Sequence, residues 1–333
     1  MTPMGESSKS VRSRSRETSG SWAWIGCRSS VRPNSYDVGD RNNDRLDSRL
    51  RGNDGGGSLR AMVPGDYDPP PLKFVHLEFP GMFRRIADRY QNCTAVVIGA
   101  GGIGGAIIQQ LVGSAGRVIV GDRDPALLRG VEKNAATTEI HGCPIDVRDA
   151  TSVADFFTFV KQTVGPPQFL FHTAGILNLE SLVETTTALW DRAVDVNLNG
   201  AFYCAQAAAQ LMIPARQGSI LILGSIAGTR ARSGSRVNPV YNTTKAGLSA
   251  FVNAAAMQWR PLGIRVNCIS PGPTATPMMD LQPTQVHDAI SQITLDQRQN
   301  EPGEVAELAL FIAAHGRFTG EDICMGGGAG LGG

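Results

Sequence analysis

The sequence predicts a single doubly wound α/β domain with a parallel sheet, preceded by a disordered N-terminal segment. From Thr94 onward, short and mostly apolar runs alternate with stretches in which apolar residues recur at helical spacing. Continuous apolar strands that alternate with helices are typical of parallel sheets covered on both faces. A glycine-rich turn joins the first strand to the first helix. No repeat of about 20 to 50 residues is present, which argues against a solenoid or propeller.

Each element of the domain follows from its local pattern. Strands are expected where apolar residues run without a break, at 94–98, 117–122, a run ending at 143–146, 169–175 with its turn, 219–223 and 264–269. Helices are expected where apolar residues recur every three or four positions, at 106–112, 125–132, 151–163, 197–213 and 241–259. Open sheets of this class place their sites at the carboxyl ends of the strands.

Residues 1–72 are predicted to be disordered. The first 60 residues hold 11 basic and 7 acidic residues, a local net charge of +4, and Ser and Arg dominate their start. Such a polar segment buries too little apolar surface to offset the entropy that ordering would cost. A misread start, with Met62 or Met82 opening the functional chain, fits the same composition, and a targeting segment or a binding tail are alternatives. We expect residues 73–93 to form a lead-in and residues 94–333 the folded domain.

The composition excludes several classes of function. The 333 residues carry 31 Lys and Arg against 30 Asp and Glu, a net charge of +1, whereas a nucleic-acid binder needs a basic excess. No apolar run approaches the roughly 18 to 20 residues of a membrane-spanning helix. The six cysteines are scattered without a Cys-x-x-Cys pair. We therefore expect no metal site, no disulfide framework and a cytoplasmic location.

The turn from Gly99 to Gly104 has the Gly-x-Gly-x-x-Gly pattern of dinucleotide sites. Glycines let the backbone approach a pyrophosphate, which binds the amides at the start of the helix. Asp122 lies 23 residues after Gly99, at the end of the next strand, where a carboxylate can bind ribose hydroxyls. An ordinary tight turn followed by a solvated aspartate is the alternative.

Tyr241 and Lys245 lie four residues apart in a predicted helix, so they share one face. A phenol is a poor base at neutral pH, whereas a nearby cation favours the phenolate. Because the chain has five lysines and five tyrosines, a chance pairing at this spacing is a weak alternative. The pair is therefore a candidate for proton transfer.

Two further polar residues occupy informative positions. Ser225 follows the predicted strand 219–223, where its hydroxyl could bind a substrate oxygen, although a helix cap is the ordinary role of such a serine. Asn197 lies inside a predicted helix, where asparagine is mildly unfavourable. Both are candidate site residues.

In this order, the motifs resemble the short-chain dehydrogenase/reductase family from about residue 94 to about 325. The resemblance implies a Rossmann-type domain, a nicotinamide cofactor and a catalytic tetrad. Tyr241 would exchange the proton, Lys245 would lower the pKa of Tyr241 and hold the nicotinamide ribose, Ser225 would polarise the reacting carbonyl or alcohol, and Asn197 would support a water linked to the lysine. Asp146 and Val147 would contact adenine, and the turn after residue 270 would contact nicotinamide. The expected cofactor-binding residues are Gly99, Gly101, Gly102, Ile103, Gly104, Asp122, Arg123, Asp146, Val147, Ala174, Gly175, Tyr241, Lys245, Pro271, Gly272, Thr274 and Thr276.

The chain departs from the family pattern at three places. In the family, three residues usually separate the first two glycines of this turn. Here only two residues, Ala100 and Gly101, lie between Gly99 and Gly102. An Asn-Asn-Ala-Gly turn is replaced by His172-Thr-Ala-Gly175, in which we expect the histidine to be structural. The 16-residue spacing from Ser225 to Tyr241 is longer than usual. Its surplus carries Arg230, Arg232 and Arg236, which could face an acidic substrate group or form a solvated loop.

The resulting hypothesis is an NAD-dependent oxidoreductase acting on a secondary alcohol or ketone, with NADP the less favoured cofactor. Within the family, a reductase of 3-oxoacyl thioesters is an alternative, and a dinucleotide sensor without turnover is another. By resemblance, residues 276–300 would form a lid over the pocket, with Met278, Met279 and Leu281 as apolar lining, and the chain would assemble as a homodimer or homotetramer. No nucleic-acid or membrane partner is expected.

Overall fold

The computed structural model describes residues 88–133, 138–229, 238–280 and 294–329, all within the unit Val75–Gly333. The predicted disordered segment 1–72 and most of the lead-in 73–93 lie outside these residues. The described end of the lead-in is a turn that buries Tyr90, whose hydroxyl donates to the carbonyl of Leu310 at 2.8 Å. The start of the domain is thus fixed to its C-terminal part.

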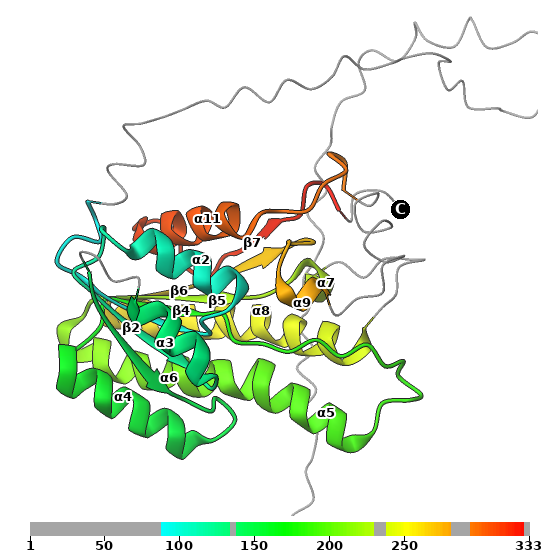
Figure 1. Cartoon of the computed structure of the whole chain (residues 1–333), viewed down its shortest axis with the longest axis horizontal. Helices are drawn as coiled ribbons and strands as arrows, with labels where there is room; N and C mark the ends of the chain where they lie inside the picture. The colour runs from blue at the N-terminus through cyan, green and yellow to red at the C-terminus, as the bar shows by residue number, and fades with distance from the viewer. Residues whose placement is uncertain (1–87, 134–137, 230–237, 281–293, 330–333) are drawn as a thin grey trace, which may run out of the picture. The chain divides into compact units, whose positions relative to one another are not determined.

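A seven-stranded parallel sheet forms the centre of the domain, in the order β3-β2-β1-β4-β5-β6-β7 (Figure 1). The chain crosses from one half of the sheet to the other between β1 and β4, which pair directly. This doubly wound order confirms the predicted fold class and places the topological switch point at the carboxyl ends of β1 and β4. The strands are β1 (Thr94–Ile98), β2 (Arg117–Asp122), β3 (Glu139–Pro144), β4 (Phe169–His172), β5 (Gly218–Leu223), β6 (Ile264–Pro271) and β7 (Asp322–Met325).

Helices cover both faces of the sheet (Figure 1). One face packs against α2 (Gly102–Leu111), α3 (Pro125–Lys133) and α11 (Pro302–Ala314), and its core includes Phe171. The other face packs against α4 (Ala150–Val164), α6 (Gly200–Met212) and α8 (Pro239–Trp259), and its core includes Leu170. Strand residues alternate between these two cores, which is why the strands are apolar throughout. The remaining helices are α5 (Thr187–Val194), the π-helical stretch η1 (Asp195–Asn199), η2 (Ile213–Ala215), α7 (Ile226–Thr229), η3 (Arg260–Leu262) and α9 (Pro277–Asp280).

The structure extends and corrects the predicted elements. The helix expected at 197–213 is a π-helical stretch followed by α6. β3 ends at Pro144, within the range 143–146 in which the third strand was expected to end. The pattern did not indicate β7, a four-residue edge strand of half-buried residues. Neither a hydrophobic period nor a long apolar run marks so short an element.

Arg265 of β6 ties the sheet to the end of α11. Its guanidinium donates to the carbonyls of Ile312, Ala313 and Phe318. Burial lowers the pKa of this arginine, so these carbonyls compensate a partly desolvated cation. Among them, Ala313 lies in the last turn of α11, whose carbonyls have few partners within the helix.

We expect Arg265→Met to lower the free energy of unfolding by about 2 to 4 kcal/mol, because several charge-assisted hydrogen bonds are lost. Urea denaturation monitored by circular dichroism measures the change. Arg317→Met, at an exposed position in the same region, is the control and should change stability by less than about 0.5 kcal/mol. Equal effects of the two substitutions would contradict the assigned role of Arg265.

Candidate active site

The candidate site lies at the carboxyl edge of the sheet. Loops after β1, β4, β5 and β6 converge there, and α8 adds residues from the face that it covers. The four predicted catalytic residues come from three segments: η1 holds Asn197, the loop after β5 holds Ser225, and α8 holds Tyr241 and Lys245.

Ser225 and Tyr241 are brought together by close packing of α7 on α8. A Cβ atom added at Gly228 would lie 2.5 Å from the backbone nitrogen of Ala246, so only glycine permits this approach. The side chains of Ser225 and Tyr241 form a hydrogen bond. The Ser225 hydroxyl also accepts from the backbone N–H of Ala227 at 3.2 Å, which fixes its direction. Gly228 is a positioning residue that sequence reasoning missed, because helix packing is not encoded in local spacing.

The phenol of Tyr241 is held in its protonated form in this structure. Burial raises the pKa of Tyr241, and the smaller effect of the hydrogen bond with Ser225 lowers it. The family resemblance implies a lowering by Lys245, whose ammonium lies 5.6 Å from the centre of the ring and donates to the carbonyl of Leu223.

Lys245 is a buried cation with one fixed acceptor. Its side chain is 4% exposed, and its Nζ donates to the carbonyl of Leu223, the last residue of β5, at 2.8 Å. Burial lowers the pKa of Lys245 to about 8. The ammonium is therefore largely charged at pH 7 and loses its proton within an accessible alkaline range.

Asn197 links three segments of the site. Its Oδ1 accepts from the backbone N–H of Ile176 at 2.8 Å, and its Nδ2 donates to the Ile176 carbonyl at 3.0 Å and to Thr244 Oγ1 at 3.1 Å. π-Helical stretches often occur at functional sites, and η1 directs this side chain inward. Thr244 in turn donates to the carbonyl of Tyr241 at 2.9 Å. The sequence drew attention to Asn197 but not to Thr244, which lies within the Tyr-x-x-x-Lys segment.

Gly175 separates Asn197 from Lys245. A Cβ atom at this position would lie 3.4 Å from both Asn197 Oδ1 and Lys245 Nζ. Any larger side chain would intrude between the amide and the ammonium. The resemblance selected Ala174 and Gly175 as cofactor contacts, and the structure places them beside the tetrad.

The glycine turn closes tightly against the loop after β4. Gly99 has a φ of 95°, and a Cβ there would lie 2.7 Å from Thr173 Oγ1. A Cβ at Gly104 would lie 1.9 Å from the carbonyl oxygen of Gly99. Gly101 differs, since the nearest atom to a Cβ there is 3.8 Å away. It is the N-cap of α2 and gives the helix no side-chain cap. The amides at the start of α2 are therefore available to a ligand.

Two carboxylates lie beyond this turn. Asp122, at the end of β2, accepts from the backbone N–H groups of Ala100 at 2.7 Å and Asp124 at 2.8 Å, which holds it against the glycine turn. Asp146 follows β3, where a hydrogen bond with Arg148 is the main cause of its lowered pKa. Arg123 is exposed beside Asp122.

Val147 packs against α6. Its side chain is buried in the core, and a Cβ on Gly200 of α6 would lie 2.8 Å from its Cγ2. The adenine contact implied by the resemblance stays a prediction.

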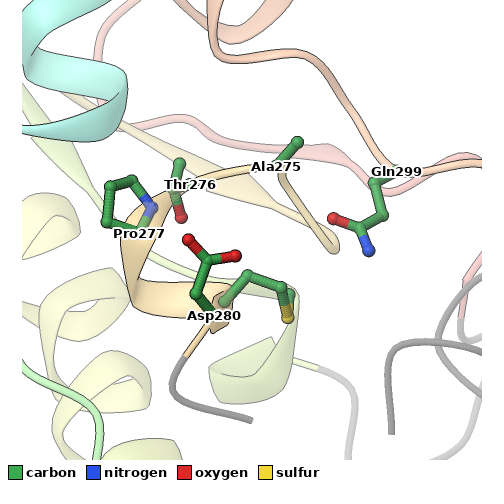
Figure 2. Close-up of a pocket in the computed structure, with 6 residues that line it drawn as sticks. Ala275, Thr276, Pro277, Asp280 and Gln299 are labelled. Atoms are coloured by element: carbon green, nitrogen blue, oxygen red, sulfur yellow. The ribbon is translucent and has the colours of Figure 1, made fainter. Parts of the chain in front are cut away.

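The segment after β6 lines a pocket of about 280 Å³ (Figure 2). Thr276 connects it to the glycine turn, since a Cβ on Gly102 would lie 3.1 Å from Thr276 Cγ2. Pro271 ends β6, Gly272 donates its N–H to the Met325 carbonyl at 2.8 Å, and Thr274 Oγ1 donates to the Gly272 carbonyl at 3.0 Å. Figure 2 shows the carboxylate of Asp280 turned toward Thr276. The lining residues are Ala275, Thr276, Pro277, Met279, Asp280 and Gln299.

Several sequence expectations fall outside the described residues, namely Arg230, Arg232, Arg236 and Leu281. His172 is buried at the end of β4, and Thr173 donates to the carbonyls of Ile98 and Gly99 at 3.0 Å each. Thr173 thus joins the loop after β4 to the end of β1 at the switch point.

Across the described ranges, no three His, Cys, Asp or Glu side chains group as a metal site would need. No helix in the same ranges is long and apolar enough to cross a membrane.

Comparisons with known proteins agree with the fold. A family profile described as "Enoyl-(Acyl carrier protein) reductase" matches residues 98–330. Galactitol 2-dehydrogenase (L-tagatose-forming) of Cereibacter sphaeroides is 31% identical, covering 73% of this chain and 97% of that protein. Human (3R)-3-hydroxyacyl-CoA dehydrogenase is 31% identical, covering 74% and 99%. The crystal structure of a 3-oxoacyl-[acyl-carrier protein] reductase from Brucella melitensis superposes with a TM-score of 0.67 at 27% identity, covering 74% and 94%.

The contact between Ser225 and Tyr241 predicts a measurable titration. In Ser225→Ala, the midpoint of the Tyr241 titration should rise, because an interaction that lowers the pKa of the phenol is lost. Carbon-13 NMR of protein labelled at tyrosine Cζ measures this midpoint, with Tyr241→Phe to assign the signal. Thr243→Ala, on an exposed part of α8, should leave it unchanged. An unchanged midpoint in Ser225→Ala would show that Ser225 does not affect the pKa of Tyr241.

Proposed function

The chain belongs to the short-chain dehydrogenase/reductase family and is an oxidoreductase, and we propose that it transfers a hydride between NAD and a secondary alcohol or ketone. The observation that carries the proposal is the convergence of Ser225, Tyr241 and Lys245 at the carboxyl edge of the sheet, next to the glycine turn. Asn197 is the fourth proposed member of this group.

The residues of the glycine turn fit a dinucleotide. The start of α2 has amides without a side-chain cap, and the space at Gly101 is not needed for packing within the protein. A glycine retained where the protein leaves room is consistent with close approach of a pyrophosphate. When bound, the nicotinamide would supply or accept the hydride. Its holders would be the turn from Gly99 to Gly104, Asp122 and the segment around Thr276.

Tyr241 is the proposed proton donor in the direction of reduction. Burial keeps its Oη protonated, so the proton is available for a substrate carbonyl oxygen. The hydroxyl of Ser225, already directed at the phenol, would donate to the same substrate oxygen. Charge that develops on that oxygen is then stabilised from two sides.

Lys245 and Asn197 are proposed to support the tyrosine. The ammonium of Lys245 lies over the ring of Tyr241 and would favour the phenolate that forms when the proton leaves. Asn197 holds the Ile176 segment and Thr244, and through Thr244 it is linked to the backbone of Tyr241. Its proposed contribution is to keep this arrangement rigid and to support a water linked to the lysine.

Asp122 favours NAD over NADP in this proposal. Its carboxylate is fixed beside the glycine turn, where it could accept bonds from both ribose hydroxyls, and a 2′-phosphate would meet like charge. Arg123 argues the other way, since it is exposed next to Asp122 and could reach a phosphate. We expect the fixed carboxylate of Asp122 to affect the cofactor preference more than Arg123, whose side chain is exposed to solvent.

The relatives define which substrates to try. One relative acts on a polyol, galactitol, and another is a (3R)-3-hydroxyacyl-CoA dehydrogenase. The neighbouring structure named as a 3-oxoacyl-[acyl-carrier protein] reductase keeps thioester reduction as the second candidate. A panel should therefore contain polyols, keto sugars and 3-hydroxyacyl thioesters. Binding without turnover across this panel would favour a dinucleotide sensor instead.

A homodimer or homotetramer is proposed through the long helices. On α6, Phe202 is 39% exposed, and on α8, Met257 is 81% exposed. Phe202 packs edge-on against Phe251 at 5.9 Å between ring centres, and Phe251 against Trp259 at 6.3 Å. Exposed apolar side chains of this kind are often covered at protein interfaces. The cytoplasmic location stays a prediction from the scattered cysteines.

Tyr241→Phe tests the mechanism. The variant should bind NADH with unchanged affinity yet lose about 10²- to 10⁴-fold in kcat, because general acid–base catalysis typically contributes that much. Fluorescence titration and steady-state turnover on the panel measure the two quantities. Tyr203→Phe, elsewhere on the helical face, is the control and should keep full activity. If Tyr241→Phe retains more than half of its activity, Tyr241 is not the residue that transfers the proton.

Asp122 gives a prediction about cofactor choice. We expect kcat/KM to be about 10²-fold higher with NADH than with NADPH, equivalent to about 2.7 kcal/mol. In Asp122→Ala, the ratio of kcat/KM with NADH to kcat/KM with NADPH should fall, mainly because kcat/KM with NADPH rises. The carboxylate is the proposed cause of the preference for NADH. Arg123→Ala should raise this ratio. A higher kcat/KM with NADPH for the unmodified enzyme would overturn the assignment.

A further inference from the structure

His172 is a buried titratable side chain that the mechanism above does not use. It is the last residue of β4 and is 1% exposed. Strand alternation places it on the same face as Leu170, whose core α6 and α8 cover, and opposite Phe171. The imidazole therefore points into the helical layer that carries Lys245.

One nitrogen of this imidazole lacks a partner. Within the described residues, His172 Nε2 is buried and makes no hydrogen bond. The other ring nitrogen bonds the residue's own backbone in a contact that raises the pKa, as donation by Nδ1–H to a carbonyl does. Nε2 then carries a lone pair and is an acceptor. Burial, the largest effect, lowers the pKa of His172 to about 3, so the ring is neutral at physiological pH. A buried acceptor without a donor is unusual and needs an explanation.

Lys245 supplies a donor at this place. His172 pairs with Ile222 of β5, and the ammonium of Lys245 binds the carbonyl of the next residue, Leu223, at 2.8 Å. An ammonium has three donors, and that carbonyl takes one of them. The charge of Lys245 also lowers the pKa of His172, so the two groups interact electrostatically.

We propose that His172 is a positioning residue, which accepts a hydrogen bond from the Lys245 ammonium through one bound water and so keeps the lysine charged beside Tyr241. A neutral acceptor favours the charged form of its donor and thus opposes the effect of burial on the lysine. Its effect on turnover rests on the proposed function, whereas its effect on the titration of the lysine does not.

The surrounding ionisable groups are few enough to interpret such a titration. Tyr241 faces the lysine from the same helix. Cys268 of β6 interacts electrostatically with Lys245 and raises the pKa of the lysine. Asp322 of β7 lies behind Cys268 and accepts from the hydroxyl of Ser270 at 2.6 Å. None of these residues is altered in the experiment.

The first measurement is the titration of Lys245 in the full chain without cofactor. Deuterated protein labelled at lysine gives five lysine signals at most, and Lys245→Met assigns the relevant one by NMR. We expect the midpoint to fall by about one pH unit in His172→Leu, which removes the acceptor. His172→Asn, whose amide oxygen can accept, should restore the midpoint. His172→Met is the second apolar variant should the leucine variant not fold.

The second measurement is the pH profile of kcat. In His172→Leu, the alkaline limb should move to lower pH by the same amount, with a loss of about tenfold at pH 9 and an unchanged KM. His172→Asn should retain the original profile. The matched control is Ser219→Ala, because Ser219 Oγ is also buried without a partner in the described residues but lies in the register position opposite Phe169, on the other face. It should alter neither quantity.

The outcomes separate the two proposals. An unchanged Lys245 midpoint in the apolar variants, or a failure of His172→Asn to restore it, would overturn the role of His172. A shifted and restored midpoint supports that role even if no member of the substrate panel is turned over by the unmodified protein, and that result would count against the proposed function.

Discussion

The site depends on the burial of one cation. Lys245 projects from α8 into the layer beneath the carboxyl edge of the sheet, where water that would solvate its ammonium is largely excluded. Desolvation alone favours the neutral amine, whereas the hydrogen bond to the carbonyl of Leu223 stabilises the charged ammonium. Every neighbouring feature of the site can be understood by how it tolerates or uses that charge.

Glycines make this arrangement sterically possible. Gly175 leaves room between the ammonium and the amide of Asn197, and Gly228 lets α7 settle onto α8 so that Ser225 meets Tyr241. Gly99 and Gly104 let the turn after β1 close against the loop after β4. At Gly99, Gly104 and Gly228 a methyl group would overlap neighbouring atoms, whereas at Gly175 only a larger side chain would intrude between the ammonium and the amide.

A hydrogen-bond network connects the end of the sheet to the helices that hold the site residues. Thr173 fixes the loop after β4 to the end of β1, and Asn197 fixes the Ile176 segment that follows to η1 and Thr244. Thr244 then connects to the backbone of Tyr241. Rigid elements hold the proposed reacting groups, whereas the pocket beyond Thr276 is built from a connecting segment. This division is what one expects where a constant chemistry serves variable substrates.

The sequence by itself determined six of the seven strands, the helices α2, α3, α4, α6 and α8, and the identity of the catalytic candidates. Strands such as 94–98 and 219–223 are marked by unbroken apolar runs, and Tyr241 and Lys245 are marked by a spacing that one helical turn enforces. Tertiary structure decided the features that arise between elements distant in sequence. The register of β3 depends on pairing with β2, the packing of Val147 depends on Gly200, and the direction of the pKa change at Tyr241 depends on burial. Local spacing cannot contain this information, because desolvation and packing are set by which surfaces meet after the chain has folded.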